Sequence, residues 1–136
     1  MGAYFWVGLG GGIGALLRYG LSLVIPSQGF PWSFFVINVS GSLVIGMVMA
    51  LVIDYAVLSQ DARLFIAVGL LGGYTTFSTF TYGLYHLMLQ HHVWRSILYG
   101  VGSILGGLLA TLLGILLANA WAEWRQSETR EPHDNP

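Results

Sequence analysis

Four long apolar stretches constrain this sequence more than any other feature. They run over residues 4–25, 32–53, 64–89 and 97–118. An α-helix needs about 20 residues to cross the hydrocarbon core of a bilayer, and each stretch reaches that length. The turns between the stretches are too short to hold a separate domain. We therefore predict an all-α membrane protein with four transmembrane helices per subunit.

The composition excludes the common classes of soluble protein. Charged residues make up 8% of the chain, whereas soluble domains carry about 25%. The 5 basic residues are all arginine and the formal net charge is -1, which argues against a nucleic-acid partner because that function requires a basic face. There is no cysteine, so disulfides, thiol nucleophiles and thiolate metal sites are excluded. No catalytic constellation occurs, and we expect a protein that is not an enzyme.

The chain divides into a long apolar part and a short polar end. Residues 1–122 form the predicted four-helix subunit, and residues 123–136 form a polar C-terminal tail that we predict to be disordered. The arginines are shared between the two sides of a four-helix topology: Arg63, Arg125 and Arg130 on one side, Arg95 on the other, with Arg18 near it. The positive-inside rule therefore predicts no clear orientation in the membrane. Two interpretations stay open: a weakly specified topology, or insertion in both orientations with pairing of antiparallel copies.

The third stretch has the most unusual pattern, a run of glycine and hydroxyl residues inside an apolar segment. The run is Gly72-Gly73-Tyr74-Thr75-Thr76-Phe77-Ser78-Thr79-Phe80-Thr81. Glycine weakens a helix, and Ser and Thr side chains compete for its backbone groups. We expect a third helix that is broken near the membrane centre, with a kink for packing as the alternative. Unwound backbone at that depth is tolerated where it faces protein or a water-filled site, and its carbonyls can hold a cation.

Other side chains in the stretches are candidates either for an ion path or for helix packing. The Asn38 amide needs a partner, which is another helix or an ion. Phe77 and Phe80 share a helix face, and because an aromatic edge is electropositive, the pair suits packing or an anion. Tyr99 and Ser103 begin a polar line on the fourth stretch, which suits an ion or hydrogen bonds between helices.

The ionisable residues narrow the choice of transport mechanism. Arg18 is the only charge well inside a stretch, and it is either a snorkelling arginine or an anchor or anion attractor. No acidic residue falls in mid-membrane, and proton-coupled exporters need one. A small proton-coupled multidrug exporter is therefore an alternative only, as is a non-transporting membrane assembly protein. His86, His91 and His92 have a spacing that favours loop histidines over a metal site.

Three motifs carry a resemblance to a known family. They are the runs from Gly11 to Tyr19, from Asn38 to Ser42 and, above all, from Gly72 to Phe80. Together they resemble the Fluc family of small bacterial fluoride channels, also called CrcB proteins, in all four stretches but not in the tail. The resemblance implies an antiparallel dual-topology homodimer in the bacterial cytoplasmic (inner) membrane. It also implies passive, fluoride-selective efflux that protects the cell from fluoride toxicity.

The resemblance assigns roles to particular residues. It places the fluoride pore at Asn38, Phe77, Phe80, Ser78, Thr79, Tyr99 and Ser103. It gives Arg18 a role in a vestibule or in the fold. It implies a structural sodium ion at the dimer centre, bound by the backbone carbonyls of Gly72 and Thr75 from each subunit. The implied partners are fluoride, sodium, the lipid bilayer and a second copy of the chain.

Overall fold

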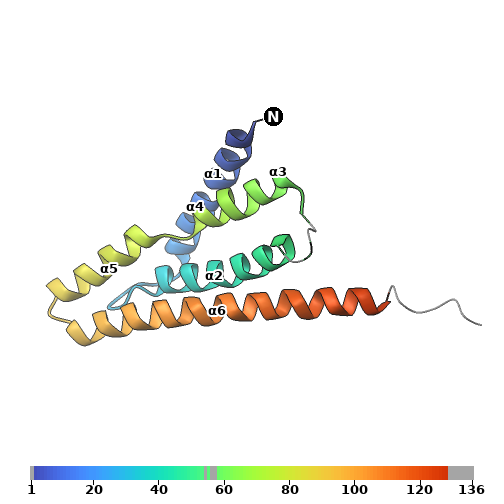
Figure 1. Cartoon of the computed structure of the whole chain (residues 1–136). Coiled ribbons are helices and arrows are strands. Elements are labelled where there is room, and N and C mark those ends of the chain that lie inside the picture. Colours follow the sequence, from blue (N-terminus) through green and yellow to red (C-terminus); the bar gives the residue numbers. More distant parts are fainter. Residues whose placement is uncertain (1, 54, 56–57, 129–136) are drawn as a thin grey trace, which may run out of the picture.

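The computed structural model describes residues 2–53, 55 and 58–128, which form helices joined by short links (Figure 1). The elements are α1 (Ala3–Val24), α2 (Trp32–Ile53), α3 (Gln60–Arg63), η1 (Leu64–Leu71), α4 (Gly72–Tyr74), α5 (Phe77–Leu89) and α6 (Val93–Glu128). No strand occurs in these described ranges. Four segments are long and apolar enough to cross a membrane: Ala3–Val24, Trp32–Val52, Gln60–Leu89 and Val93–Glu128. The prediction of an all-helical fold with four helices able to cross a membrane is confirmed for the described residues.

The third of these segments is assembled from several pieces. α3, η1 and α4 follow one another directly, and η1 is a π-helix, a form that often occurs at functional sites. Thr75 and Thr76 then adopt extended backbone, with φ and ψ of -77° and 156° and of -150° and 124°. α5 begins at Phe77, and Figure 1 shows the non-helical link between α4 and α5. The interruption therefore falls inside the glycine and hydroxyl run.

Glycines bring α1 into direct backbone contact with the first half of the third segment. A Cβ atom on Gly10 would collide with the Phe65 carbonyl oxygen, and one on Gly14 with the Leu70 carbonyl oxygen. Small residues permit this close approach between membrane helices. The contact places the C-terminal half of α1 beside the helix interruption.

A second glycine contact joins α2 to α6, which lie side by side in Figure 1. A Cβ atom on Gly46 would collide with the Thr111 carbonyl, and one on Gly114 with the Leu43 carbonyl. The Thr111 hydroxyl also donates a hydrogen bond to the Ser42 carbonyl at 3.2 Å. These contacts determine which face of α6 packs against the face of α2 that carries Asn38.

α6 is longer than the apolar pattern predicts. Its 36 residues correspond to about 54 Å at 1.5 Å per residue, against about 30 Å of hydrocarbon. The helix includes residues 123–128, which the sequence analysis assigns to the tail, so it continues past the expected boundary at residue 122. No Gly or Pro interrupts this part of the chain, and the Arg125 guanidinium lies 5.2 Å from the Trp121 ring centre. The rest of the predicted tail, 129–136, lies outside the described residues.

The turn between α5 and α6 is also shorter than predicted. His91 has a φ of 60°, and its N–H donates to the Met88 carbonyl at 3.0 Å while that of His92 donates to the Leu87 carbonyl at 2.9 Å. This pair of bonds is a Schellman motif, in which glycine usually takes the left-handed position. Because the motif closes α5 so tightly, α6 begins at Val93.

Candidate ion site at the helix break

A cavity of about 440 Å³ opens beside the interruption of the third segment. Its lining includes six residues of the predicted sites, namely Asn38, Gly72, Thr75, Phe77, Phe80 and Ser103. The other lining residues are Gly41, Ser42, Ile45, Ala67, Leu71, Thr76 and Ile104. No Asp, Glu, Lys, Arg or His occurs in this set, so the cavity offers amide, hydroxyl and aromatic groups without a fixed charge.

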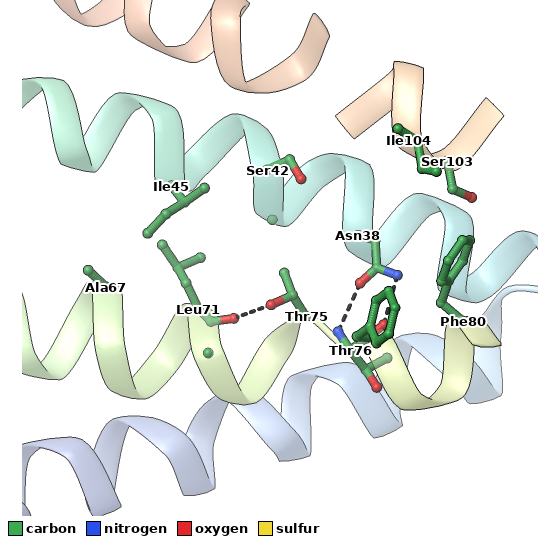
Figure 2. Close-up of a pocket in the computed structure, with 13 residues that line it drawn as sticks. Asn38, Ser42, Ile45, Ala67, Leu71, Thr75, Thr76, Phe80, Ser103 and Ile104 are labelled. Carbon is green, nitrogen blue, oxygen red and sulfur yellow. Dashed lines mark hydrogen bonds between the residues drawn. The ribbon is translucent and has the colours of Figure 1, made fainter. Parts of the chain in front are cut away.

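Asn38 on α2 binds directly to the backbone of the interruption. Its Nδ2 donates to the Thr76 carbonyl at 3.0 Å, and its Oδ1 accepts from the Thr76 N–H at 2.9 Å. Figure 2 shows this pairing among the residues that line the cavity. One amide thus satisfies both backbone groups of a buried residue, which would otherwise be costly at this depth. Of the two partners considered for Asn38, the structure places another segment of the protein beside it.

Thr76 is the centre of the local hydrogen-bond network, although the sequence analysis gives it no role. Its hydroxyl accepts from the Thr79 N–H at 3.3 Å, donates to Thr79 Oγ1 at 3.2 Å, and lies 3.2 Å from Ser78 Oγ. Thr76 is therefore the N-cap of α5. The signal in the sequence is a threonine immediately before a helix-forming run, a position that Ser, Thr, Asp and Asn favour.

The predicted aromatic pair forms one side of the cavity but has two different environments. The Phe77 and Phe80 ring centres are 5.8 Å apart with an interplanar angle of 42°. Phe80 is 8% exposed and packs against Tyr99, with ring centres 5.2 Å apart, whereas Phe77 is 76% exposed. The Phe80 ring is therefore held against α6 by Tyr99, whereas most of the Phe77 ring is not covered by any other part of this chain.

The predicted hydroxyl residues fall into two groups. Ser103 lines the cavity, and its Oγ is buried without a hydrogen-bond partner in the part of the chain that the structure describes. The buried Tyr99 hydroxyl also lacks such a partner there, but Tyr99 lies in the core behind Phe80 and does not line the cavity. Ser78 and Thr79 belong to the hydrogen-bond network around the Thr76 hydroxyl, and Thr79 lines a second cavity.

Arg18 and the two predicted carbonyls meet at the same interruption. The half-buried Arg18 donates from Nη1 to the Thr75 carbonyl at 3.5 Å. The N–H groups one turn beyond Gly72 donate elsewhere, that of Thr75 to the Leu71 carbonyl and that of Thr76 to Asn38 Oδ1. The Gly72 carbonyl is thereby released from regular helical bonding, and a Cβ atom on Gly72 would meet nothing within 4 Å.

Comparison with known proteins decides the family. The family described as "CrcB-like protein, Camphor Resistance (CrcB)" matches residues 5–115. A Thermus thermophilus protein named "Fluoride-specific ion channel FluC" is 44% identical over 123 residues, which cover 88% of this chain and 98% of the relative. The chain belongs to the CrcB family.

Other CrcB relatives match a similar share of this chain. Proteins with the same name from Chlorobium phaeobacteroides and a Synechococcus species are 38% and 42% identical, over 88% and 86% of this chain and 95% and 92% of their own lengths. The resemblance found in the sequence is therefore confirmed. Because CrcB proteins are channels, the expectation that the chain is not an enzyme is confirmed as well.

Proposed function

We propose that this chain is the subunit of a fluoride-selective channel in the bacterial cytoplasmic membrane, and that it gives passive fluoride efflux. Such efflux would protect the cell from fluoride toxicity. The observation that carries the proposal is the cavity at the helix break, where Asn38, Phe80 and Ser103 converge without any ionisable group. The name shared by the relatives, fluoride-specific ion channel, supports the choice of ion.

The chemistry of the cavity suits a small anion. A pore must replace the water around an ion with donors, yet bind weakly enough to release it. An amide group has two N–H donors, and Asn38 uses one on the Thr76 carbonyl, so the second is available for fluoride. The Phe77 and Phe80 edges add positive potential, and the buried Ser103 hydroxyl is a further donor without a competing partner in the described chain.

The other proposed pore residues extend this path. Ser78 and Thr79 extend the hydrogen-bond network from the Thr76 hydroxyl, and Tyr99 lies one turn of α6 before Ser103. Arg18 contributes at the vestibule or in the fold, through its bond to the Thr75 carbonyl. A line of neutral donors conducts without trapping the anion on a fixed charge.

We further propose that two chains form an antiparallel, dual-topology homodimer. Phe77, a proposed pore residue, is 76% exposed in the single chain. A second copy of the chain would cover this surface and complete the wall of the pore. The balanced arginine distribution supports insertion in both orientations. Crosslinking through single cysteines introduced at Phe77 tests the interface, since the native chain has no cysteine.

A sodium ion at the dimer centre fits the backbone groups that are present. Carbonyls of unwound membrane segments coordinate sodium. The Gly72 carbonyl is released from helical bonding, and the Thr75 carbonyl accepts one long bond from Arg18, which leaves it a second lone pair. When bound, the ion supplies positive charge near the anion path. The test is thermal: sodium at about 100 times its dissociation constant should stabilise the protein by about 2.7 kcal/mol, and potassium should not.

Ion flux from liposomes tests the proposed function. Purified protein should release fluoride rapidly and chloride negligibly, and equal release of both anions contradicts the proposal. Phe80→Ile and Asn38→Asp should each reduce fluoride release by at least about 100-fold, which corresponds to about 2.7 kcal/mol, while size-exclusion chromatography shows an intact dimer. Phe5→Ile is the matched control, because Phe5 lies on α1 and does not line the cavity.

The same assay separates the two alternatives. A proton-coupled multidrug exporter requires substrate uptake driven by a pH gradient, and the cavity has no carboxylate to couple it. A membrane assembly protein requires that no ion passes at all.

A further inference from the structure

The orientation of the Phe80 ring depends on its neighbours. The torsion that turns a phenylalanine ring about the Cβ–Cγ bond has only broad, roughly two-fold preferences. The edge of the ring carries positive potential and its face carries negative potential. A ring beside an anion path therefore attracts or repels the ion according to how the surrounding side chains orient it. Phe80 lines the candidate ion cavity, so the residues that hold its ring matter for the ion.

Of the two aromatic residues in contact with Phe80, only Tyr99 is enclosed by this chain. Phe77 is 76% exposed, whereas Tyr99 is 0% exposed. The ring centres of Phe80 and Tyr99 lie 5.2 Å apart with an interplanar angle of 52°. Within one chain, the position of the Phe80 ring therefore depends on the position of the Tyr99 ring.

Packing alone holds the Tyr99 ring. Its buried hydroxyl has no hydrogen-bond partner in the part of the chain that the structure describes. The half-buried Phe30 meets it in a T-shaped contact, with ring centres 5.4 Å apart and an interplanar angle of 80°. On the α5 side, a Cβ atom on Gly83 would lie 3.1 Å from Tyr99 Cε1. Tyr99 thus occupies a tight slot between Phe30, Gly83 and Phe80.

The link between α1 and α2 determines where Phe30 lies. The preceding residue, Gly29, has a φ of 72°, a conformation that glycine adopts without strain. The Arg95 guanidinium on α6 donates to the Gly29 carbonyl at 3.2 Å, and the Trp32 ring lies 4.5 Å from the Phe30 ring. Phe30 does not line the candidate ion cavity, so it reaches the ion path through Tyr99.

We propose that Phe30 is a positioning residue for the fluoride path: through the Tyr99 ring, it holds the Phe80 ring in the orientation that favours an anion. The proposal rests on the proposed channel function. Without the Phe30 ring, Tyr99 has space to tilt away from Phe80. The Phe80 ring then turns more freely and spends part of its time with its face toward the ion, which slows fluoride passage.

Single-channel recording in planar bilayers tests the proposal, because the current through one channel does not depend on how many chains fold. Phe30→Ala should lower the unitary fluoride current by about threefold to tenfold, the factor that corresponds to one aromatic pair. Phe30→Tyr retains the ring and should keep most of the native current. A merely structural role for Phe30 would reduce the number of active channels and leave the current through each one unchanged.

Phe35→Ala is the matched control for loss of a ring. Phe35 is also half-buried and packs against the same core cluster, but its ring contact is with Trp32, 6.0 Å away. This variant should lower the unfolding temperature and keep the native unitary current. An equal fall in current in Phe35→Ala and Phe30→Ala would overturn the specific role of Phe30.

A second variant disturbs the same slot without a change at Phe30. Gly83→Ala places a methyl group against Tyr99 and should also lower the unitary current. Gly100→Ala is its control, because that Cβ atom makes a similarly tight contact between α6 and α5, at 3.2 Å, but with Leu84 Cδ2. Native unitary current in both Phe30→Ala and Gly83→Ala overturns the positioning role alone. Absence of fluoride current in the native protein overturns the proposed channel function, and the positioning role with it.

Discussion

The third and fourth membrane segments have similar residue compositions but different backbone structures. Residues 60–89 contain four glycines and residues 93–128 contain five, and both segments carry Ser and Thr in their apolar parts. The fourth segment is one continuous helix, α6, whereas the third has extended backbone at Thr75 and Thr76. Glycine and hydroxyl content therefore does not by itself decide where a membrane helix ends.

The difference lies in what the neighbouring helix α2 offers to each segment. To α6 it offers backbone: the Thr111 hydroxyl bonds to the Ser42 carbonyl, and Gly114 packs on Leu43. To the third segment it offers the Asn38 amide, which takes both backbone groups of Thr76 out of helical bonding. An external amide that satisfies the released groups makes the interruption tolerable in hydrocarbon.

Removal of the Asn38 amide should have the largest effect on this contrast. Asn38→Leu leaves the Thr76 N–H and carbonyl without their partner, at about 1–3 kcal/mol for each buried group. The free energy of unfolding of the purified protein in detergent should fall by about 2–6 kcal/mol, and fluoride flux should fall with it.

Ser42→Ala is the matched control for the Asn38 change. Ser42 lies one turn further along α2 and lines the same cavity, but only its carbonyl takes part in the contact with Thr111. The control should stay within about 0.5 kcal/mol of the native protein. Equal losses in both variants would mean that the cavity lining as a whole, and not the amide, maintains the interruption.

Enlargement of a glycine in the α2–α6 contact should have the next largest effect, and it should act on stability rather than on ion selectivity. A Cβ atom on Gly114 meets the Leu43 backbone, so Gly114→Val should destabilise the protein by about 1–3 kcal/mol through overpacking. Gly102→Ala is the control, since its Cβ atom would meet only Phe35 Cε2, at 3.9 Å. A variant at Gly114 that folds but admits chloride would show that the two segments are not separate in function.

Loss of the Thr76 hydroxyl should cost less, because the Asn38 pairing uses only the backbone of Thr76. Thr76→Ala removes the N-cap of α5 and should cost about 1 kcal/mol in thermal unfolding. Thr81→Ala provides the comparison, because that exposed hydroxyl bonds back to the Ser78 carbonyl of its own helix, and it should cost less than about 0.5 kcal/mol. If Thr76→Ala costs as much as Asn38→Leu, the hydroxyl network and the amide form one unit.

The contrast also explains how much the sequence could predict. Length and hydropathy identify four spans, and the unusual residues mark the region of the site, because both are local properties. The role of Thr76 depends on Asn38, 38 residues earlier, and local propensity contains no information about that contact. The start and end of α6 do not follow from the sequence for another reason. The residues from Val93 to Ser96 and from 123 to 128 are polar or exposed, and hydropathy does not distinguish a solvated helix from a loop.

The turn that joins the two segments allows the smallest and most specific test. His91 occupies the left-handed position of the Schellman motif with a φ of 60°, where a residue with a side chain is less stable than glycine. His91→Gly should therefore stabilise the protein by about 0.5–1 kcal/mol, after the larger chain entropy of glycine is taken into account. The reciprocal variant is Gly29→Ala, in the link between α1 and α2, where φ is 72° and a Cβ atom would lie 3.1 Å from Arg95 Nη1. It should lower the unfolding temperature, and if both variants lower it, the two turns do not limit stability through backbone conformation.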